Sequence, residues 1–268
     1  MNFGAIDVHI SLAAEKLFEV GGVSITNAML LGIIGFIVTL AIGLYAVITL
    51  KNKKTNRLTQ IFQWMFEGLV GQVNSIITDP KLARKITPLA LTVFIFILVN
   101  YWLSVLPGVG PITWNSIPMF RGLTADLNFT LGLAIVTMLT VQLYAIKHLG
   151  VFKNAERYFI NPIKDPIGAF EGFLELIGEF SRGVALALRL FGNAFAGEVL
   201  LIVIAALTSY FASVALPIFM AFEFFIGFIQ AYVFFILTLI FTALAQVSHG
   251  PLDVHSPTLK PKKAQELE

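Results

Sequence analysis

The 268-residue chain contains no cysteine and little charge, since only 13% of its residues are Asp, Glu, Lys or Arg. The absence of cysteine excludes disulfides, cysteine-ligated iron–sulfur clusters and thiol catalysis. Soluble domains average about 25% charged residues. The low charge, together with 57% hydrophobic residues, therefore indicates an integral membrane protein. A net charge of +2 without a continuous basic stripe also excludes nucleic-acid binding.

Motifs of metal and hydrolase sites are missing as well. The four histidines show no metal-ligand spacing, and neither His-Glu-x-x-His nor Gly-x-Ser-x-Gly occurs. We therefore expect no metal, no cofactor and no catalytic site on this chain. Its first 25 residues carry more acid than base, which is the wrong charge for a signal peptide, so we expect this segment to be kept.

Five apolar stretches each reach the roughly 20 residues that a helix needs to cross the hydrocarbon core. They predict an all-α integral membrane protein with spans at about 26–50, 87–106, 127–146, 167–207 and 217–247. One membrane domain would cover 26–248, between an external segment at 1–25 and a cytoplasmic tail at 249–268. Between the first two spans, residues 58–77 repeat apolar side chains at helical spacing and predict an amphipathic helix on the cytoplasmic surface.

Most basic residues fall on one side of this arrangement. By the positive-inside rule that side is cytoplasmic, which places the N-terminus outside and the C-terminus inside. Lys16 and Arg121 fall on the opposite side, and Arg182 and Arg189 lie in the fourth helical segment. The other 14 of the 18 basic residues are Lys51, Lys53, Lys54, Arg57, Lys81, Arg84, Lys85, Lys147, Lys153, Arg157, Lys164, Lys260, Lys262 and Lys263.

The last two spans are too long to stand upright in a bilayer. A helix from Ile167 to Leu207 would measure about 60 Å, twice the ~30 Å hydrocarbon core. With Pro217 at its first position, which proline favours, the last helix would measure about 46 Å. The lengths predict a steeply tilted hairpin that offers one long side to a partner.

Arg189 is the most unusual residue of the fourth span, because a fixed charge at membrane depth costs about 2.5 to 3.5 kcal/mol or more. Arginine cannot lose its proton, so an electrostatic use is favoured over proton exchange. The alternative is an arginine that snorkels to the interface or is paired inside the protein. The 100° helical step places it in a polar stripe, beside small residues that would let another helix approach closely. The stripe holds Glu171, Glu175, Glu179, Arg182, Arg189 and Asn193, and the small residues are Gly178, Ala185, Gly192 and Ala196.

Two acids lie in similarly apolar sequence. Glu198 falls about 180° from Arg189 on the helical wheel, so the two cannot form a simple ion pair on one helix. Glu223 and Gln230 are seven residues apart and share one face of the last helix. Intramembrane acids are typical of proton relays, whereas the alternative is a glutamate that is hydrogen-bonded as structural support. Two acids and one permanent cation together favour ion translocation.

The run Leu188-Arg-Leu-Phe-Gly-Asn-Ala-Phe-Ala-Gly-Glu198 strongly resembles the signature of the subunit a family of rotary F-type ATP synthases, the membrane stator beside the c-ring. Three further stretches match in chain order: Pro88-Leu-Ala-Leu-Thr-Val-Phe-Ile-Phe96 with Asn100, Thr124-Ala-Asp-Leu-Asn128, and Ile229-Gln-Ala-Tyr-Val-Phe-Phe-Ile-Leu-Thr238. The matches cover roughly residues 58 to 248, and the arginine motif is the specific one.

The resemblance implies a non-catalytic, proton-translocating stator of the Fo sector, with Arg189 as the essential charge that separates two half-channels. Its partners would be the c-ring, the peripheral-stalk subunit b, the rest of the F1Fo complex and membrane lipid, in the bacterial plasma (inner) membrane. The outer path would use Glu198 and Glu223, with Gln230 interacting with the arginine and Asn100, Asp126 and Asn128 near the outer entrance. For the inner path, the polar stripe supplies Glu175, Glu179 and Asn193 as candidates.

Two positions depart from the family pattern. Leu103 stands where some members have an acid, so the outer path would rely more on Asp126 and water, and Ala185 stands where some have a serine. The competing function is a self-contained secondary transporter or ion channel, but such folds usually show internal repeats, which this sequence lacks. The ion-binding carboxylate would belong to the ring, so H⁺ and Na⁺ both remain candidates for the coupled ion.

Overall fold

The computed structural model describes residues 11–51, 57–107, 109, 112–114, 117–151, 158, 166–208 and 211–245. Within these ranges, five helices are long and apolar enough to cross a membrane, which confirms the all-α membrane fold. They are α1 (Asn27–Lys51), α3 (Pro80–Val105), α4 (Leu127–Leu149), α6 (Pro166–Thr208) and α7 (Ala212–Leu244). The predicted tail at 249–268 lies outside the described residues.

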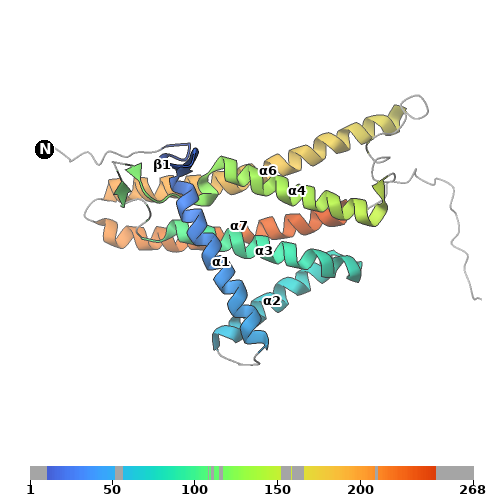
Figure 1. The fold of residues 1–268 in the computed structure, drawn as a ribbon, viewed down its shortest axis with the longest axis horizontal. Helices are drawn as coiled ribbons and strands as arrows, with labels where there is room; N and C mark the ends of the chain where they lie inside the picture. Colours follow the sequence, from blue (N-terminus) through green and yellow to red (C-terminus); the bar gives the residue numbers. More distant parts are fainter. Residues whose placement is uncertain are drawn as a thin grey trace, which may run out of the picture.

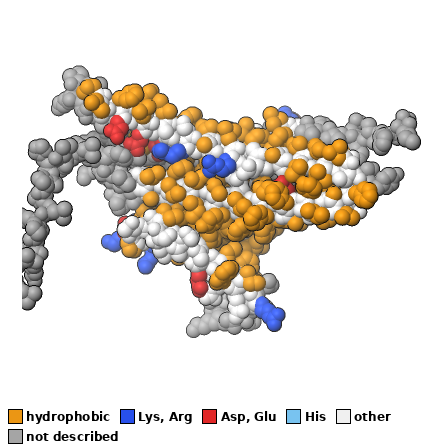
Figure 2. Space-filling model, turned by 180° about the vertical axis from the view of Figure 1, so that it is seen from behind, with side chains coloured by type: hydrophobic (Ala, Val, Ile, Leu, Met, Phe, Trp, Pro, Cys, Tyr) orange, Lys and Arg blue, Asp and Glu red, His pale blue; other side chains and the backbone are white. Residues whose placement is uncertain are grey.

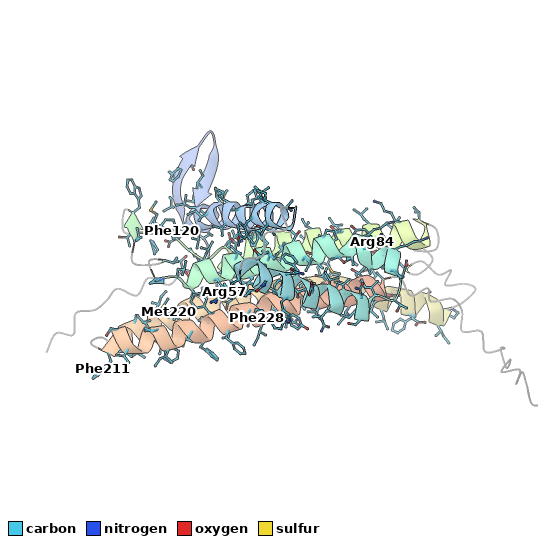
Figure 3. All side chains as sticks on the ribbon, turned by 90° about the horizontal axis from the view of Figure 1, so that it is seen from below. Arg57, Arg84, Phe120, Phe211, Met220 and Phe228 are labelled. Carbon is cyan, nitrogen blue, oxygen red and sulfur yellow. The ribbon has the colours of Figure 1, made fainter. Side chains whose placement is uncertain are left out.

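The helices form an elongated molecule in which α3 packs against α7, and α6 contacts both α4 and α7 (Figure 1). The main core lies where α3 meets α7, around the fully buried Phe94, Ile97, Phe234 and Phe235. Helix α1 crosses this set of long helices steeply. Figure 3 places Phe211, at the start of the last helix, and Arg84, near the start of α3, toward opposite ends of the molecule.

The two last helices are long, as predicted, with 43 residues in α6 and 33 in α7. Helix α7 nevertheless begins at Ala212, so the predicted start at Pro217 is wrong and this proline lies inside the helix. A helix in lipid must satisfy its backbone groups internally, so continuing the helix through the apolar residues 212–216 is favourable even with one bond lost at the proline. Helix α3 likewise begins before its predicted span, at Pro80, where the Asp79 side chain accepts a hydrogen bond from the Lys81 amide at 3.0 Å.

Two strands that we did not predict precede α1. Strands β1 (Lys16–Val20) and β2 (Val23–Thr26) form an antiparallel hairpin. Its two-residue turn has φ of 60° at Gly21 and 84° at Gly22, which is the left-handed backbone that two-residue hairpin turns require and glycine favours. A second short ladder joins β3 (Thr113–Trp114) to β4 (Ile117–Pro118) at the same end of the molecule.

Helix α2 (Arg57–Ile76) confirms the predicted amphipathic helix. Leu69 and Val73 are buried in the core, and Met65 and Ile76 pack against it. Ile61 and Trp64 point away, with 63% and 79% of their surface exposed. The helix therefore has one face on the protein and a large indole on its free side.

Candidate functional site

Arg189 lies near the middle of α6, and its side chain is exposed on the surface of the chain. Its neighbours Ala185, Gly192 and Ala196 are exposed as well. Apart from its neighbours in the chain and the local helix backbone, no described atom lies within 4 Å of the Cβ that another residue would have at Gly192. Figure 2 shows acidic and basic side chains crossing a largely hydrophobic surface. The small-residue face beside the arginine is thus open on this chain.

Glu223 of α7 is buried, with 2% of its surface exposed. Its carboxylate accepts a hydrogen bond from the Tyr101 hydroxyl of α3 at 3.1 Å. The same hydroxyl lies 3.4 Å from the backbone oxygen of Asn193 on α6. One tyrosine therefore joins three helices around the acid.

Gln230 continues this polar cluster along α7. Its Oε1 accepts a hydrogen bond from the Asn193 Nδ2 at 2.6 Å. The side chain is 2% exposed, and its Nε2 has no hydrogen-bond partner among the described residues. Asn193 follows Arg189 by four residues and so lies on nearly the same helical face. Polar groups therefore extend from the buried acid to the helical face that carries the exposed arginine.

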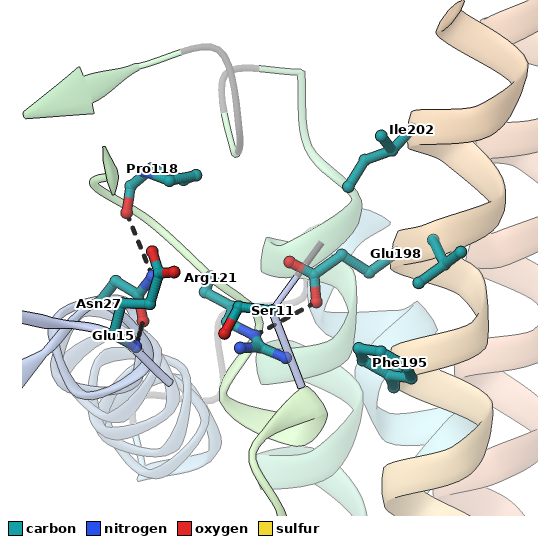
Figure 4. A pocket seen from close by; sticks show the side chains of 9 residues that line it. Ser11, Glu15, Asn27, Pro118, Arg121, Phe195, Glu198 and Ile202 are labelled. Carbon is teal, nitrogen blue, oxygen red and sulfur yellow. Dashed lines mark hydrogen bonds and ion pairs between the residues drawn. The ribbon is translucent and has the colours of Figure 1, made fainter. Parts of the chain in front are cut away.

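Glu198 faces a second arginine, Arg121, which precedes the 3-10 helix η1 (Leu123–Ala125). The Arg121 Nε lies 3.5 Å from the Glu198 Oε2, and Figure 4 marks this ion pair with a dashed line. Only 4% of Arg121 is exposed. Its two terminal nitrogens donate to backbone oxygens of Ala13 at 2.6 Å, Leu12 at 3.3 Å and Ala125 at 3.4 Å. This buried cation is thus surrounded by acceptors.

Glu198 lines two small cavities. One, of about 30 Å³, is lined by Glu198, Arg121 and Glu15, among others. The other, of about 10 Å³, is lined by Glu198, Glu223 and Tyr101, among others. A cavity of about 10 to 15 Å³ on this measure holds one water molecule. The structure therefore brings the two predicted acids to one water-sized space and links the first acid to a second such space.

Two glycines allow these side chains to approach so closely. A side-chain atom at Gly197 of α6 would overlap the carboxylate of Glu223. One at Gly227 of α7 would overlap the ring of Tyr101. The cluster depends on the absence of side chains at both positions.

The other predicted outer residues line neither of these cavities. Asn100 is buried and donates to the Phe96 oxygen at 2.8 Å, while its Oδ1 has no hydrogen-bond partner within the described ranges. Asp126 caps α4, where its side chain accepts from the Asn128 amide at 3.0 Å. The Asn128 side chain is exposed. These three residues remain predictions for the outer entrance.

In the N-terminal half of α6, the side chains of the polar stripe contact different helices. Glu179 accepts hydrogen bonds from Gln142 of α4 and from Tyr158. The guanidinium of Arg182 instead lies over the Phe241 ring of α7, 5.8 Å from its centre. Gln142 and Glu179 also line a mostly apolar cavity of about 290 Å³ between α4 and α6. The structure therefore separates Glu179 from the cluster around Glu223, and Glu175 is half-buried nearer the helix start.

Tyr101 and Arg121 were not among the predicted site residues. Arg121 carried a signal, because it is one of two basic residues predicted on the outer side and lies in a largely apolar segment. Tyr101 directly follows Asn100 but has no distinguishing pattern of its own. Across the described residues, no three His, Cys, Asp or Glu side chains gather in a way that could hold a metal ion.

These helices and the polar cluster inside them define a multi-pass, all-α membrane protein with charged and amide groups at membrane depth. The sequence model of the ATP synthase A chain family matches residues 29–243. The chain belongs to this family. It is accordingly a membrane subunit of the Fo sector, takes part in proton transport, and is part of the F1Fo complex.

Individual relatives agree along most of the chain. ATP synthase subunit a of Desulforamulus reducens is 33% identical over 237 residues, which cover 85% of this chain and 83% of the relative. The protein of that name from Mycobacterium ulcerans is 32% identical over 228 residues, covering 82% and 86%. That of Acidothermus cellulolyticus is 28% identical over 235 residues, covering 86% and 81%.

Proposed function

We propose that the chain forms two offset aqueous half-channels, neither of which crosses the membrane alone. Protons would enter from outside past Asp126, Asn100 and Asn128, reach Glu198, and pass to Glu223. The observation that carries this proposal is the shared cavity of Glu198 and Glu223, followed by the contacts among Tyr101, Asn193 and Gln230, of which Asn193 lies one helical turn from Arg189. Water-sized spaces beside both acids support proton transfer through bound water.

In this proposal Arg189 faces a carboxylate on a helix of the c-ring. A positive charge a few ångströms away stabilises the ionised form of that carboxylate and so favours release of its proton. The same charge repels protons that would otherwise pass directly between the half-channels. The exposure of Arg189 and the open surface at Gly192 support such an approach of another helix.

The inner half-channel would start from the same arginine and use Asn193, Glu175 and Glu179. The hydrogen bonds of Glu179 with Gln142 and Tyr158 keep this acid beside the α4–α6 cavity, which supports its place in a separate path. The chain would act as a stator without a catalytic site, held by subunit b of the peripheral stalk. We place it in the bacterial inner membrane with its N-terminus outside and its C-terminus in the cytoplasm.

Replacing Arg189 with lysine in the complete ATP synthase tests this function. Arg189→Lys is expected to abolish ATP-driven proton pumping in inside-out membrane vesicles, because lysine can deprotonate when desolvated and lacks the planar fork of arginine. The matched control is Arg182→Lys on the same helix, whose charge can still lie over Phe241. Full pumping by Arg189→Lys would contradict the proposal.

Reconstitution of the purified chain in liposomes distinguishes the stator from the alternative, a self-contained transporter. We expect the purified chain in liposomes to conduct no protons unless the c-ring is added. Coupled transport by the chain alone would favour the self-contained transporter.

A further inference from the structure

Arg121 connects separate segments of the chain at the outer end of the molecule. It donates to two backbone oxygens of the N-terminal segment, at Leu12 and Ala13, and to that of Ala125 in η1. Toward α6 it faces Glu198, and its guanidinium carbon lies 5.8 Å from the centre of the Phe195 ring, one turn earlier. The N-terminal segment, η1 and α6 therefore all meet at one guanidinium.

These contacts fix the direction in which the charge points. The terminal nitrogens of Arg121 donate to the three backbone oxygens, and its Nε lies 3.5 Å from the Glu198 Oε2, which is an ion-pair contact without a hydrogen bond. Because the guanidinium is planar, holding two of its nitrogens sets the place of the third. A buried cation is also costly to leave unpaired, so the arrangement favours keeping the carboxylate beside it.

Glu198 lines both of the water-sized cavities described above. Glu15 lines the first cavity with it, and Glu223 and Tyr101 line the second. Arg121 is the basic side chain among the residues that line these two spaces. A shift of the Glu198 side chain would change the lining of both spaces.

We propose that Arg121 is a positioning residue of the outer half-channel, which holds the Glu198 carboxylate between the two cavities and ties the N-terminal segment over the outer one. This inference rests on the proposed function. Arg121 does not itself carry the proton. It acts through Glu198, and this dependence separates its role from a general contribution to folding.

A double-mutant cycle in the assembled ATP synthase tests the inference. Arg121→Gln is expected to slow ATP-driven pumping by about tenfold to 10²-fold, since displacing a reacting group by about 1 Å can have an effect of that size. In a Glu198→Gln background the same change should add less than about twofold, because the carboxylate that Arg121 holds is gone. Equal losses in both backgrounds, or wild-type pumping by Arg121→Gln, would overturn the inference.

A labelling experiment covers the case in which Glu198→Gln pumps too slowly to measure. The chain has no native cysteine, so Ser104→Cys places one reporter thiol in the inner of the two cavities. We expect Arg121→Gln to speed its reaction with a membrane-impermeant maleimide added from outside, because the N-terminal segment is released. An unchanged labelling rate would count against the tie that we propose.

Two further variants complete the design. Lys16→Gln, the matched control, removes an exposed positive charge at the same end of the molecule and should leave pumping and labelling unchanged. Arg121→Lys keeps the charge but not the fork, and should fall between the wild type and Arg121→Gln. If the Arg121→Gln complex does not assemble, the double-mutant cycle with Glu198→Gln is measured with Arg121→Lys instead. If substitutions of Arg121 leave pumping unchanged while Arg189→Lys abolishes it, only this inference is refuted. If Arg189→Lys pumps fully, the proposed function is refuted.

Discussion

At the scale of single residues, the buried carboxylate of Glu223 is held by close packing as well as by hydrogen bonding. The Tyr101 hydroxyl donates to it, while Gly197 leaves the space on α6 that the carboxylate occupies. The acid, its donor and this space belong to three different helices. The position of the acid is therefore sensitive to changes that remove no polar group.

Gly197→Ala tests this dependence. The added methyl group overlaps the Glu223 carboxylate, so we expect it to break the Tyr101 contact and to slow ATP-driven pumping about tenfold or more. Gly132→Ala on α4 is the control, because outside the local helix backbone and the chain neighbours no described atom lies within 4 Å of the added group. Alanine favours helices over glycine by about 1 kcal/mol, so lost pumping could not be ascribed to a weaker helix. Equal pumping by the two variants would show that the glycine is dispensable.

Single residues differ in how far the sequence reveals them. Polar groups are rare in apolar spans, which makes Arg189, Glu198, Glu223 and Gln230 conspicuous. In the structure, Glu198 and Glu223 line one cavity, and Tyr101 and Asn193 connect Glu223 to Gln230. Tyr101 is not conspicuous, since a tyrosine fits an apolar helix and its partner Glu223 is 122 residues away along the chain. Asp126 is conspicuous in the sequence for a different reason, because it caps α4, and the sequence alone does not distinguish a helix cap from a channel acid.

At the scale of elements, the lengths of α6 and α7 follow from apolar composition alone, whereas their ends do not. Proline marks a helix start in most settings, but helix continuation in lipid outweighs the single bond lost at Pro217. The hairpin before α1 could have been predicted, because Gly21-Gly22 between two short alternating segments is a known turn pattern.

The small-residue face of α6 leads to a prediction about assembly. Gly192→Leu places a bulky side chain where the chain itself has open space, so the subunit should fold normally. If a c-ring helix packs there, the complex should lose the ring during purification and stop pumping. Gly132→Leu is the control, again on an exposed helical surface with open space. Intact assembly and pumping by Gly192→Leu would place the ring elsewhere.

At the scale of the whole molecule, large apolar side chains are exposed along α1, α4, α6 and α7. A soluble protein rarely exposes apolar patches larger than a few hundred square ångströms. This surface therefore needs lipid and neighbouring subunits to cover it. The β1–β2 hairpin lies toward one end of the long helices, and Arg84, near the start of α3, lies toward the other.

The orientation of the molecule is directly measurable, because the chain has no cysteine to interfere. We expect an impermeant maleimide to label Ser11→Cys in intact cells and Arg84→Cys only in inside-out vesicles. The expectation follows from the basic residues near Arg84, which favour the cytoplasmic side. Protection of the first thiol and labelling of the second in intact cells would reverse the proposed orientation.

The exposed indole of Trp64 on α2 bears on how deep the protein sits. Tryptophan settles where lipid headgroups meet acyl chains, because its ring is apolar and its N–H seeks water. Because α2 packs against the rest of the fold, the preference of this ring for the headgroup region would set the depth of the whole subunit in the membrane. The level of Arg189 in the bilayer, and so the level at which it faces a partner helix, would then depend on a side chain of α2.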